Sequence, residues 1–152
     1  MGFARLSLKA RALRLLAQRE HSRSELQAKL ARHVQEGEDL AALLDELQAR
    51  GFIDAARVAE SVVHRRAARL GAQRVAQELR RKGLDEDLVR ATAAQLAGTE
   101  LERARAVWRQ RYGGAPAAAT PQERARQIRF LAARGFAADV VRRVVQGGED
   151  DE

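Results

Sequence analysis

The sequence contains no cysteine, which excludes disulfide bonds and cysteine-ligated zinc or iron–sulfur centres. Aromatic residues make up only 4% of the chain, and its two prolines, Pro116 and Pro121, lie close together. Long stretches on both sides of them therefore lack helix breakers. No apolar run approaches the length of a transmembrane helix, and the N-terminus lacks the apolar core of a signal peptide. We therefore expect a cytoplasmic protein without a membrane segment.

The chain carries an excess of positive charge. Its 28 basic and 21 acidic residues give a formal charge of +7. The last four residues, 149–152, are all acidic, and without them the 28 basic residues face 17 acidic ones, a charge of +11. Such a surface attracts nucleic acid or an acidic protein, but it is also compatible with a solvated helical protein from an arginine-favouring genome. Charge alone leaves both interpretations open.

Hydrophobic residues recur at helical spacing along nearly the whole chain. Leu40, Leu43, Leu44 and Leu47 illustrate the pattern, because they stand at positions i, i+3, i+4 and i+7 of one helix. The apolar residues are mainly alanine and leucine, which suits helices that pack through aliphatic side chains. The pattern predicts nine helices, at about residues 7–19, 22–30, 39–50, 54–70, 72–82, 85–97, 99–112, 120–134 and 137–146.

Residues with capping chemistry precede several of these helices. Ser22 and Thr120 are each followed three residues later by a glutamate, which is the capping-box pattern, and Pro121 occupies a favourable first helical position. Asp54 and Asp85 are expected to cap the fourth and sixth helices. Residues 113–119 form the only predicted loop that is longer than a turn.

Three helices end in the same way, with a leucine, three further residues, a glycine and a large apolar residue. The three segments are 47–52, 79–84 and 131–136. Glycine adopts the left-handed C′ conformation of a Schellman motif without a Cβ penalty, and the residue after it folds back on the leucine. A basic residue before each glycine faces the negative end of the helix dipole. Repeated endings of this kind indicate a helical array, and such arrays usually serve as binding surfaces.

The helices fall into three groups of three. Leu30, Leu79 and Leu131 align in the middle helices of the groups, at separations of 49 and 52 residues, which lies within the range of helical repeats. Gly83 and Gly135 end middle helices whereas Gly51 ends a third helix, so the shared ending does not itself mark the repeat. We predict an all-α fold of three tandem three-helix units, residues 1–52, 53–97 and 98–146, followed by a disordered acidic tail, residues 147–152.

Four segments connect the sequence to a known family. They are residues 24–30 (Ser-Glu-Leu-Gln-Ala-Lys-Leu), 51–59 (Gly-Phe-Ile-Asp-Ala-Ala-Arg-Val-Ala), 77–84 (Gln-Glu-Leu-Arg-Arg-Lys-Gly-Leu) and 131–136 (Leu-Ala-Ala-Arg-Gly-Phe) with Val140 and Val141. In order and spacing they resemble the RecX proteins over about residues 6–146. Two features depart from that family: Ala55 and Ala56 replace its usual acidic pair, and the loop of the first unit is altered.

The resemblance implies an elongated, curved array of three-helix units. It also implies a function, because RecX proteins bind the filament of the recombinase RecA, lie in its helical groove and inhibit its recombinase and ATPase activities. The chain is then a regulatory protein that modulates homologous recombination, DNA repair and the SOS response. Its implied partner is the RecA filament, and direct contacts with single- or double-stranded DNA are a further option.

Basic residues of the second and third units are our candidates for contacts with the RecA filament or with DNA. The candidates are Arg65, Arg66, Arg69, Arg74, Arg81, Lys82, Arg126, Arg129 and Arg134. Arg74 and Arg81 lie seven residues apart and therefore share one face of their helix. Arginine offers planar, bidentate donors that suit carboxylate and phosphate groups. The alternative for each of these residues is a solvated position on an exposed helix face.

A second hypothesis is a stand-alone, sequence-nonspecific DNA-binding protein of helix-turn-helix-like bundles, because three-helix units with arginine-rich faces are compatible with it. Against it, no unit shows an obvious base-reading helix in which Asn or Gln is grouped with the arginines. The sequence contains neither a Gly-x-Ser-x-Gly elbow nor a phosphate-binding P-loop. We therefore expect a monomeric protein that is not an enzyme and needs no cofactor or metal.

The aromatic residues and the histidines carry weaker expectations. Trp108 and Tyr112 share a helix face with apolar residues, which favours a core position over stacking on a base. Phe130 lies beside the apolar stripe of its helix and is the better candidate for an exposed contact. The histidines lack the spacing of metal ligands and are expected at the surface; they are His21, His33 and His64.

Overall fold

The computed structural model describes residues 5–113 and 120–146 of the chain. Within these ranges it contains nine α-helices, one short 3₁₀ helix after α2 and no strand. The helices are α1 (Leu8–Gln18), α2 (Arg23–Leu30), α3 (Leu40–Ala49), α4 (Ala55–Arg66), α5 (Ala72–Arg81), α6 (Glu86–Ala97), α7 (Glu100–Tyr112), α8 (Pro121–Ala133) and α9 (Ala138–Gln146). Residues 114–119 of the predicted loop and the predicted acidic tail lie outside the described residues.

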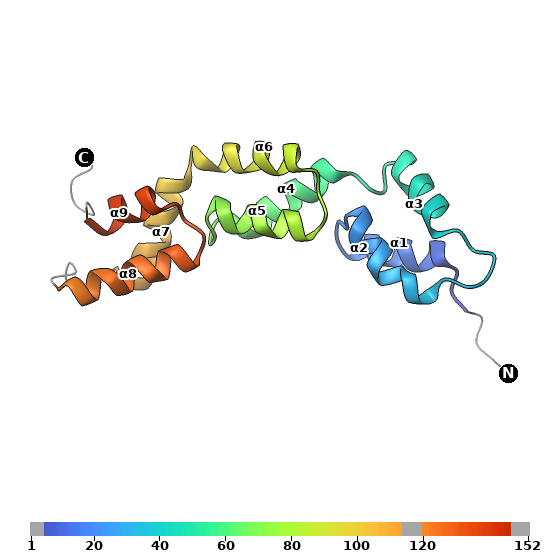
Figure 1. The fold of residues 1–152 in the computed structure, drawn as a ribbon, viewed down its shortest axis with the longest axis horizontal. Coiled ribbons are helices and arrows are strands. Elements are labelled where there is room, and N and C mark those ends of the chain that lie inside the picture. Colours follow the sequence, from blue (N-terminus) through green and yellow to red (C-terminus); the bar gives the residue numbers. More distant parts are fainter. Residues whose placement is uncertain (1–4, 114–119, 147–152) are drawn as a thin grey trace.

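The helices form three consecutive units of three, and together the units make an elongated molecule (Figure 1). The first unit (α1–α3) lies at one end, the second (α4–α6) in the middle and the third (α7–α9) at the other end. Each unit has a hydrophobic cluster of its own. Leu30, Leu79 and Leu131 lie in the three clusters and are at most 1% exposed. The predicted all-α array of three-helix units is therefore confirmed, and these leucines are its equivalent core positions.

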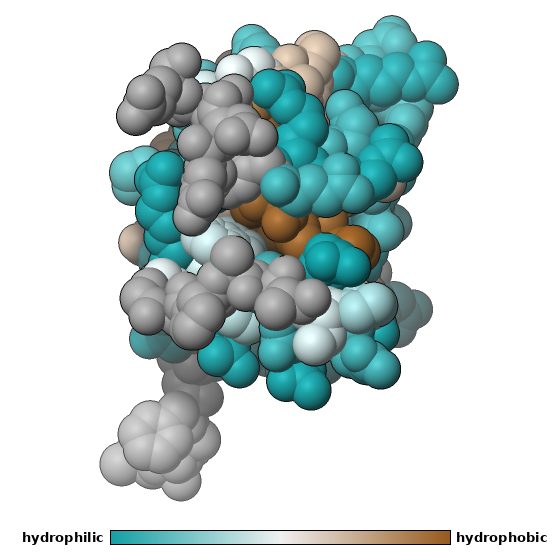
Figure 2. Space-filling model, turned by 90° about the vertical axis from the view of Figure 1, so that its left-hand side faces the viewer, coloured by the Kyte–Doolittle hydropathy of each residue, from teal (hydrophilic) through white to brown (hydrophobic). Residues whose placement is uncertain are grey.

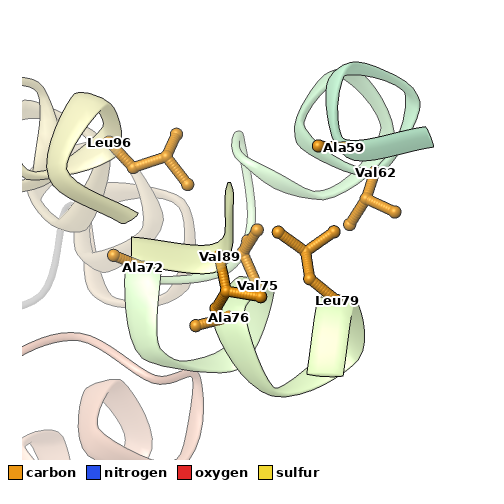
Figure 3. Packing of buried hydrophobic residues seen from close by; sticks show 8 residues of the cluster. All are labelled: Ala59, Val62, Ala72, Val75, Ala76, Leu79, Val89 and Leu96. Carbon is orange, nitrogen blue, oxygen red and sulfur yellow. The ribbon is translucent and has the colours of Figure 1, made fainter. Parts of the chain in front are cut away.

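The core of the second unit shows how such a small cluster is closed. Side chains from α4, α5 and α6 meet between the three helices (Figure 3). Val62 from α4, Leu79 from α5 and Val89 from α6 are fully buried there. Aliphatic residues of this size leave little space between short helices, and each contributes about 1.5–3 kcal/mol of burial free energy. Ile53, which follows α3, packs in the core of the first unit.

The capping predictions are confirmed except at α6. Ser22 and Thr120 both form complete capping boxes with the glutamates three residues later. The side chain of Asp54 accepts a hydrogen bond from the backbone N–H of Arg57 at 3.1 Å. Asp85 does occupy the N-cap position of α6, but its side chain makes no capping hydrogen bond. This residue is exposed, and water can satisfy the first amide groups of the helix there.

The three Schellman endings are also confirmed. Gly51, Gly83 and Gly135 have φ angles of 80°, 76° and 88°. In each ending the backbone N–H of the residue after the glycine donates to the carbonyl of the leucine, and the distances are 2.9 Å from Phe52 to Leu47, 3.2 Å from Leu84 to Leu79 and 3.4 Å from Phe136 to Leu131. The fourth helix is shorter than expected, because it ends at Arg66 and residues 67–70 form a turn.

Candidate partner-binding surface

The helix ending at Gly83 forms the contact between the first and second units, which we call the first joint. The hydroxyl of Ser22 donates a hydrogen bond to the carbonyl of Lys82 at 2.6 Å. The side chain of Ser24 occupies the space that a Cβ atom at position 83 would need. The C-terminus of α5 therefore abuts the N-terminus of α2.

The ending at Gly135 forms an equivalent contact between the second and third units, the second joint. The backbone N–H of Gly71 donates to the carbonyl of Arg134 at 2.8 Å, and that of Gln73 donates to the carbonyl of Gly135 at 3.3 Å. The guanidinium of Arg74 donates to the carbonyl of Ala133 at 2.6 Å. The C-terminus of α8 therefore abuts the N-terminus of α5, as α5 abuts α2.

The two joints place the middle helices α8, α5 and α2 head to tail along the molecule (Figure 1). At each joint the carbonyl end of one helix meets the amide end of the next. Backbone N–H groups at the start of α5 donate to carbonyls at the end of α8 in the second joint, and the hydroxyl of Ser22 donates to the carbonyl of Lys82 in the first. The third ending has no such role. None of the described residues lies within 4 Å of a Cβ atom built at Gly51, and Phe52 is 43% exposed. The same local motif thus serves as a joint twice and as a plain helix end once.

A partly buried carboxylate, that of Glu25, carries the electrostatics of the first joint. Glu25 lies 2.7 Å from a guanidinium nitrogen of Arg19 and 3.2 Å from the ammonium of Lys82, and it also accepts from the backbone N–H of Ser22 at 3.1 Å. Burial by itself would raise the pKa of Glu25, but the hydrogen bonds from Arg19 and Ser22 and the charge of Lys82 outweigh it and lower the pKa to about 2. Glu25 therefore stays ionised and ties the two units together.

The free energy of unfolding should depend on the ionisation of Glu25. Its pKa is lower in the folded state, so this stabilisation is fully present above about pH 5 and is lost as the pH falls from 4.5 towards 2. The shift corresponds to at most about 3 kcal/mol. Urea unfolding between pH 7 and pH 3 should show a difference between wild type and Glu25→Gln that shrinks below pH 4.5. A difference that stays constant over this range would contradict the assignment.

The second joint relies on two residues of α7 that sequence reasoning missed. Glu100 is only 5% exposed, and its carboxylate accepts from the backbone N–H of Ala72 at 2.7 Å. It caps α5 from another unit, because Gly71 at the N-cap has no side chain to do so. Arg103 donates to the carbonyls of Ala67 and Leu70 at 2.8 and 2.7 Å. From the sequence alone, Glu100 and Arg103 could be recognised only as charged residues in the first turn of an amphipathic helix.

The structure divides the predicted contact residues into two sets. Four of them make contacts within the protein. Arg74 lies in the second joint, Lys82 pairs with Glu25 in the first, Arg66 lies 3.3 Å from a carboxylate oxygen of Glu78, and the guanidinium of Arg134 lies 5.0 Å from the ring centre of Phe130. The other five have exposed side chains; they are Arg65, Arg69, Arg81, Arg126 and Arg129. For all nine, contact with a partner remains a prediction.

Three of the exposed arginines lie along the row of middle helices. Arg126 and Arg129 share one face of α8 with Ala133, whose carbonyl receives the hydrogen bond from Arg74. Arg74 in turn shares one face of α5 with Arg81. The second joint places the helices that carry Arg126, Arg129 and Arg81 end to end, and we call these three exposed arginines the basic row. Arg65 and Arg69 lie at the end of α4 and in the following turn, outside the row.

The aromatic residues pack together in the third unit. Trp108 is half-buried against the third core, and its Nε1–H donates to Gln127 at 3.0 Å. Tyr112 packs edge-on against Phe130, with ring centres 5.6 Å apart. Phe130 is half-buried, so it offers less surface than expected. Viewed from this end, the molecule shows hydrophobic residues in the centre and hydrophilic side chains around them (Figure 2).

The expectation of a surface position is wrong for His21, which is 1% exposed. Its Nε2 lies 3.0 Å from the ammonium of Lys29, which can only donate, so Nδ1 carries the proton and donates to the carbonyl of Arg19 at 3.0 Å. Burial is the main cause that lowers the pKa of His21. The ring closes the corner between α1 and α2, a packing position that helical periodicity does not reveal.

The described residues contain no group of three or more His, Asp or Glu side chains that could hold a metal ion. None of the helices described in the ranges 5–113 and 120–146 is long and apolar enough to cross a lipid bilayer.

Family models match two of the three units. Residues 54–92 match the second three-helix domain of RecX, and residues 99–145 match the third. The chain is 55% identical to the regulatory protein RecX of Leptothrix cholodnii over 141 residues, which cover 93% of this chain and 88% of that protein. It is 47% identical to the regulatory protein RecX of Herminiimonas arsenicoxydans, over all of this chain and 99% of that one.

Solved structures share the fold at low sequence identity. A RecX crystal structure from Lactobacillus salivarius has a TM-score of 0.76 at 18% identity and covers 92% of this chain and 93% of that one. A second crystal structure of a regulatory protein RecX has a TM-score of 0.75 at 21% identity, over 92% of this chain and 71% of that one. Both support the array of three-helix units.

Proposed function

The chain belongs to the RecX family of regulatory proteins, and from this premise we propose that it binds the RecA–DNA filament in the helical groove. Bound there, it inhibits the recombinase and ATPase activities of RecA. Through this activity the protein modulates homologous recombination, DNA repair and the SOS response. It acts in the cytoplasm as a monomer, without a cofactor.

The observation that carries this proposal is the basic row. Arg81, Arg126 and Arg129 lie on helices that the second joint holds end to end, so these exposed arginines are spread along the molecule. A helical protein filament presents the same acidic groups once per subunit along its groove. An elongated protein with charges at fixed intervals suits such a surface, because its contacts are aligned before binding and little conformational entropy is lost.

The two joints also favour binding to the filament, because they hold the middle helices in line. Two backbone hydrogen bonds and the contact of Arg74 hold α8 against α5, and Ser22 and Glu25 hold α5 against α2. A stiff array of this kind binds along several filament subunits at once, and the effective concentration of each later contact is high. We infer that inhibition results from bridging neighbouring subunits, which hinders the changes that accompany ATP hydrolysis.

The test is the hydrolysis of ATP by RecA on single-stranded DNA, measured with substoichiometric amounts of this protein. We expect clear inhibition, since one molecule that bridges subunits affects more than one active site. No inhibition, together with tight RecA-independent DNA binding whose affinity falls steeply with salt, would instead support a stand-alone DNA-binding protein.

A further inference from the structure

A groove with a volume of about 510 Å³ lies in the first unit, between α1 and the end of α2 with the 3₁₀ helix that follows. This is the size of site that accepts a small ligand. Its rim carries the basic side chains of Arg11, Arg14, Lys29, Arg32 and His33. None of the described residues that line it is acidic. The groove lies in a different unit from the basic row.

The basic side chains come from both walls of the groove. Arg11 and Arg14 stand three residues apart on α1, and Lys29 and Arg32 stand three residues apart across the end of α2, so that each pair shares a helix face. The two faces are turned toward each other, because all four side chains line the same space. Such convergence of like charge is unfavourable unless an anion occupies the site.

Contacts within the protein leave donors available in this groove. The Nε–H of Arg11 is buried and has no hydrogen-bond acceptor among the described residues. Arg14 and Arg32 are exposed. The Nε–H of Arg32 donates to Nε2 of His33 at 3.2 Å, and the terminal nitrogens of Arg32 are then available to donate to a ligand. Arg5 donates to the backbone carbonyl of His33 at 2.6 Å and so fixes this side of the groove.

The local electrostatic potential is positive. Partial burial and then the charges of Arg11, Arg32 and Arg5 lower the pKa of His33, as expected where cations crowd a site without a carboxylate. Leu6, Leu15 and Leu30 line the same groove. An apolar floor below several guanidinium groups suits a ligand that is charged at one end and carries a sugar at the other.

We propose that this groove binds a phosphate group carried by a DNA strand or by a free nucleotide. Arg14 and Arg32 donate to the phosphate oxygens as planar, bidentate groups, Lys29 adds a point charge, and the leucines contact the sugar. Several donors around a small space suit phosphate better than a single carboxylate, because phosphate offers more acceptor oxygens. The proposal does not depend on RecA binding, since the protein alone is sufficient for its test.

The experiment compares the full chain with two variants of equal charge. Arg14→Glu combined with Arg32→Glu alters the groove, and Arg109→Glu combined with Arg142→Glu reverses two exposed arginines of the third unit as a matched control. Binding of fluorescein-labelled oligothymidylate is measured by anisotropy over a range of salt concentrations, and binding of ATP and of inorganic phosphate by calorimetry. Circular dichroism checks helix content, and the milder pair Arg14→Gln with Arg32→Gln replaces the first if that variant unfolds.

We expect the groove variant to bind oligothymidylate about 10- to 100-fold more weakly than wild type. The slope of log affinity against log salt concentration should fall by about two. The control variant should change the affinity and the slope much less. If ATP or phosphate also binds to wild type and not to the groove variant, the phosphate group that occupies the groove belongs to a free nucleotide or is free phosphate. If only the oligonucleotide binds, the phosphate group belongs to DNA. Equal effects of groove and control variants on every probe, or no binding of any probe, would overturn the proposal.

Discussion

Replacement of Gly135 by alanine is expected to destabilise the protein by about 4 kcal/mol, because two unfavourable effects act at one position. Its φ of 88° is a backbone conformation that alanine adopts only with strain. A Cβ atom there would also overlap the side chain and the backbone nitrogen of Arg74. The substitution therefore destabilises both the Schellman motif and the second joint.

Two matched substitutions separate these effects. Gly51→Ala introduces the same strain, at a φ of 80°, at a site where no atom of residues 5–113 or 120–146 lies within 4 Å of the new Cβ, and should cost only about 1–2 kcal/mol. Gly71→Ala introduces a clash with the backbone of Gly135 and Phe136 at a negative φ, and should cost about 2–3 kcal/mol.

Urea unfolding measures the three free energies, and small-angle scattering reports whether the third unit changes its position relative to the second. We expect scattering to change for Gly135→Ala and Gly71→Ala and to remain unchanged for Gly51→Ala. Equal destabilisation by Gly135→Ala and Gly51→Ala, with identical scattering, would show that the second joint contributes nothing to stability.

Reversal of the basic row is expected to have the largest effect on function. Replacing Arg81, Arg126 and Arg129 together by glutamate should raise the concentration needed for half-inhibition of RecA by about 100-fold or more. Each replacement removes an attraction to the filament and adds a repulsion. The sequence pairs Arg81 with Arg74, but Arg74 is left unchanged because its contact with Ala133 would confound loss of binding with loss of the second joint.

The matched control reverses three exposed arginines that lie off the row, Arg90, Arg109 and Arg142. It changes the net charge by the same amount and should alter inhibition by only a few-fold, through long-range electrostatics. Both variants should retain wild-type helix content. Unchanged inhibition by the row variant, or an equal loss in the control, would show that another face of the molecule binds the filament.

The helices could be predicted from the sequence because their determinants are local. The stripe from Leu40 to Leu47 and the capping boxes at Ser22 and Thr120 act within one or two helical turns. The glycines with positive φ at the helix ends are also local determinants, because they act within the last turn of the helix. Asp85 is the exception: it starts its helix without a side-chain cap, because exposure to water makes that hydrogen bond dispensable.

The candidate surface was predicted only in part. Exposed arginines such as Arg81, Arg126 and Arg129 follow from helical periodicity, because they lie opposite the buried stripe. The same periodicity gives Arg74 and Lys82 the same appearance, although both make contacts in the joints. The groove residues Arg11 and Arg14 could not be predicted as a site, since a basic pair at i and i+3 becomes informative only when a second pair faces it.

The sequence by itself determined the helices, their ends, the three-unit repeat and the family. The helices and their ends depend on residues a few positions apart, the repeat on the spacing of Leu30, Leu79 and Leu131, and the family on a pattern shared with relatives. The tertiary structure decided what the helix ends do. The joints connect Ser22 with Lys82, Ala72 with Glu100 and Arg74 with Ala133, which are 60, 28 and 59 residues apart. Such contacts depend on how whole units are oriented, and identical local motifs at Gly51 and Gly135 give no indication of that orientation.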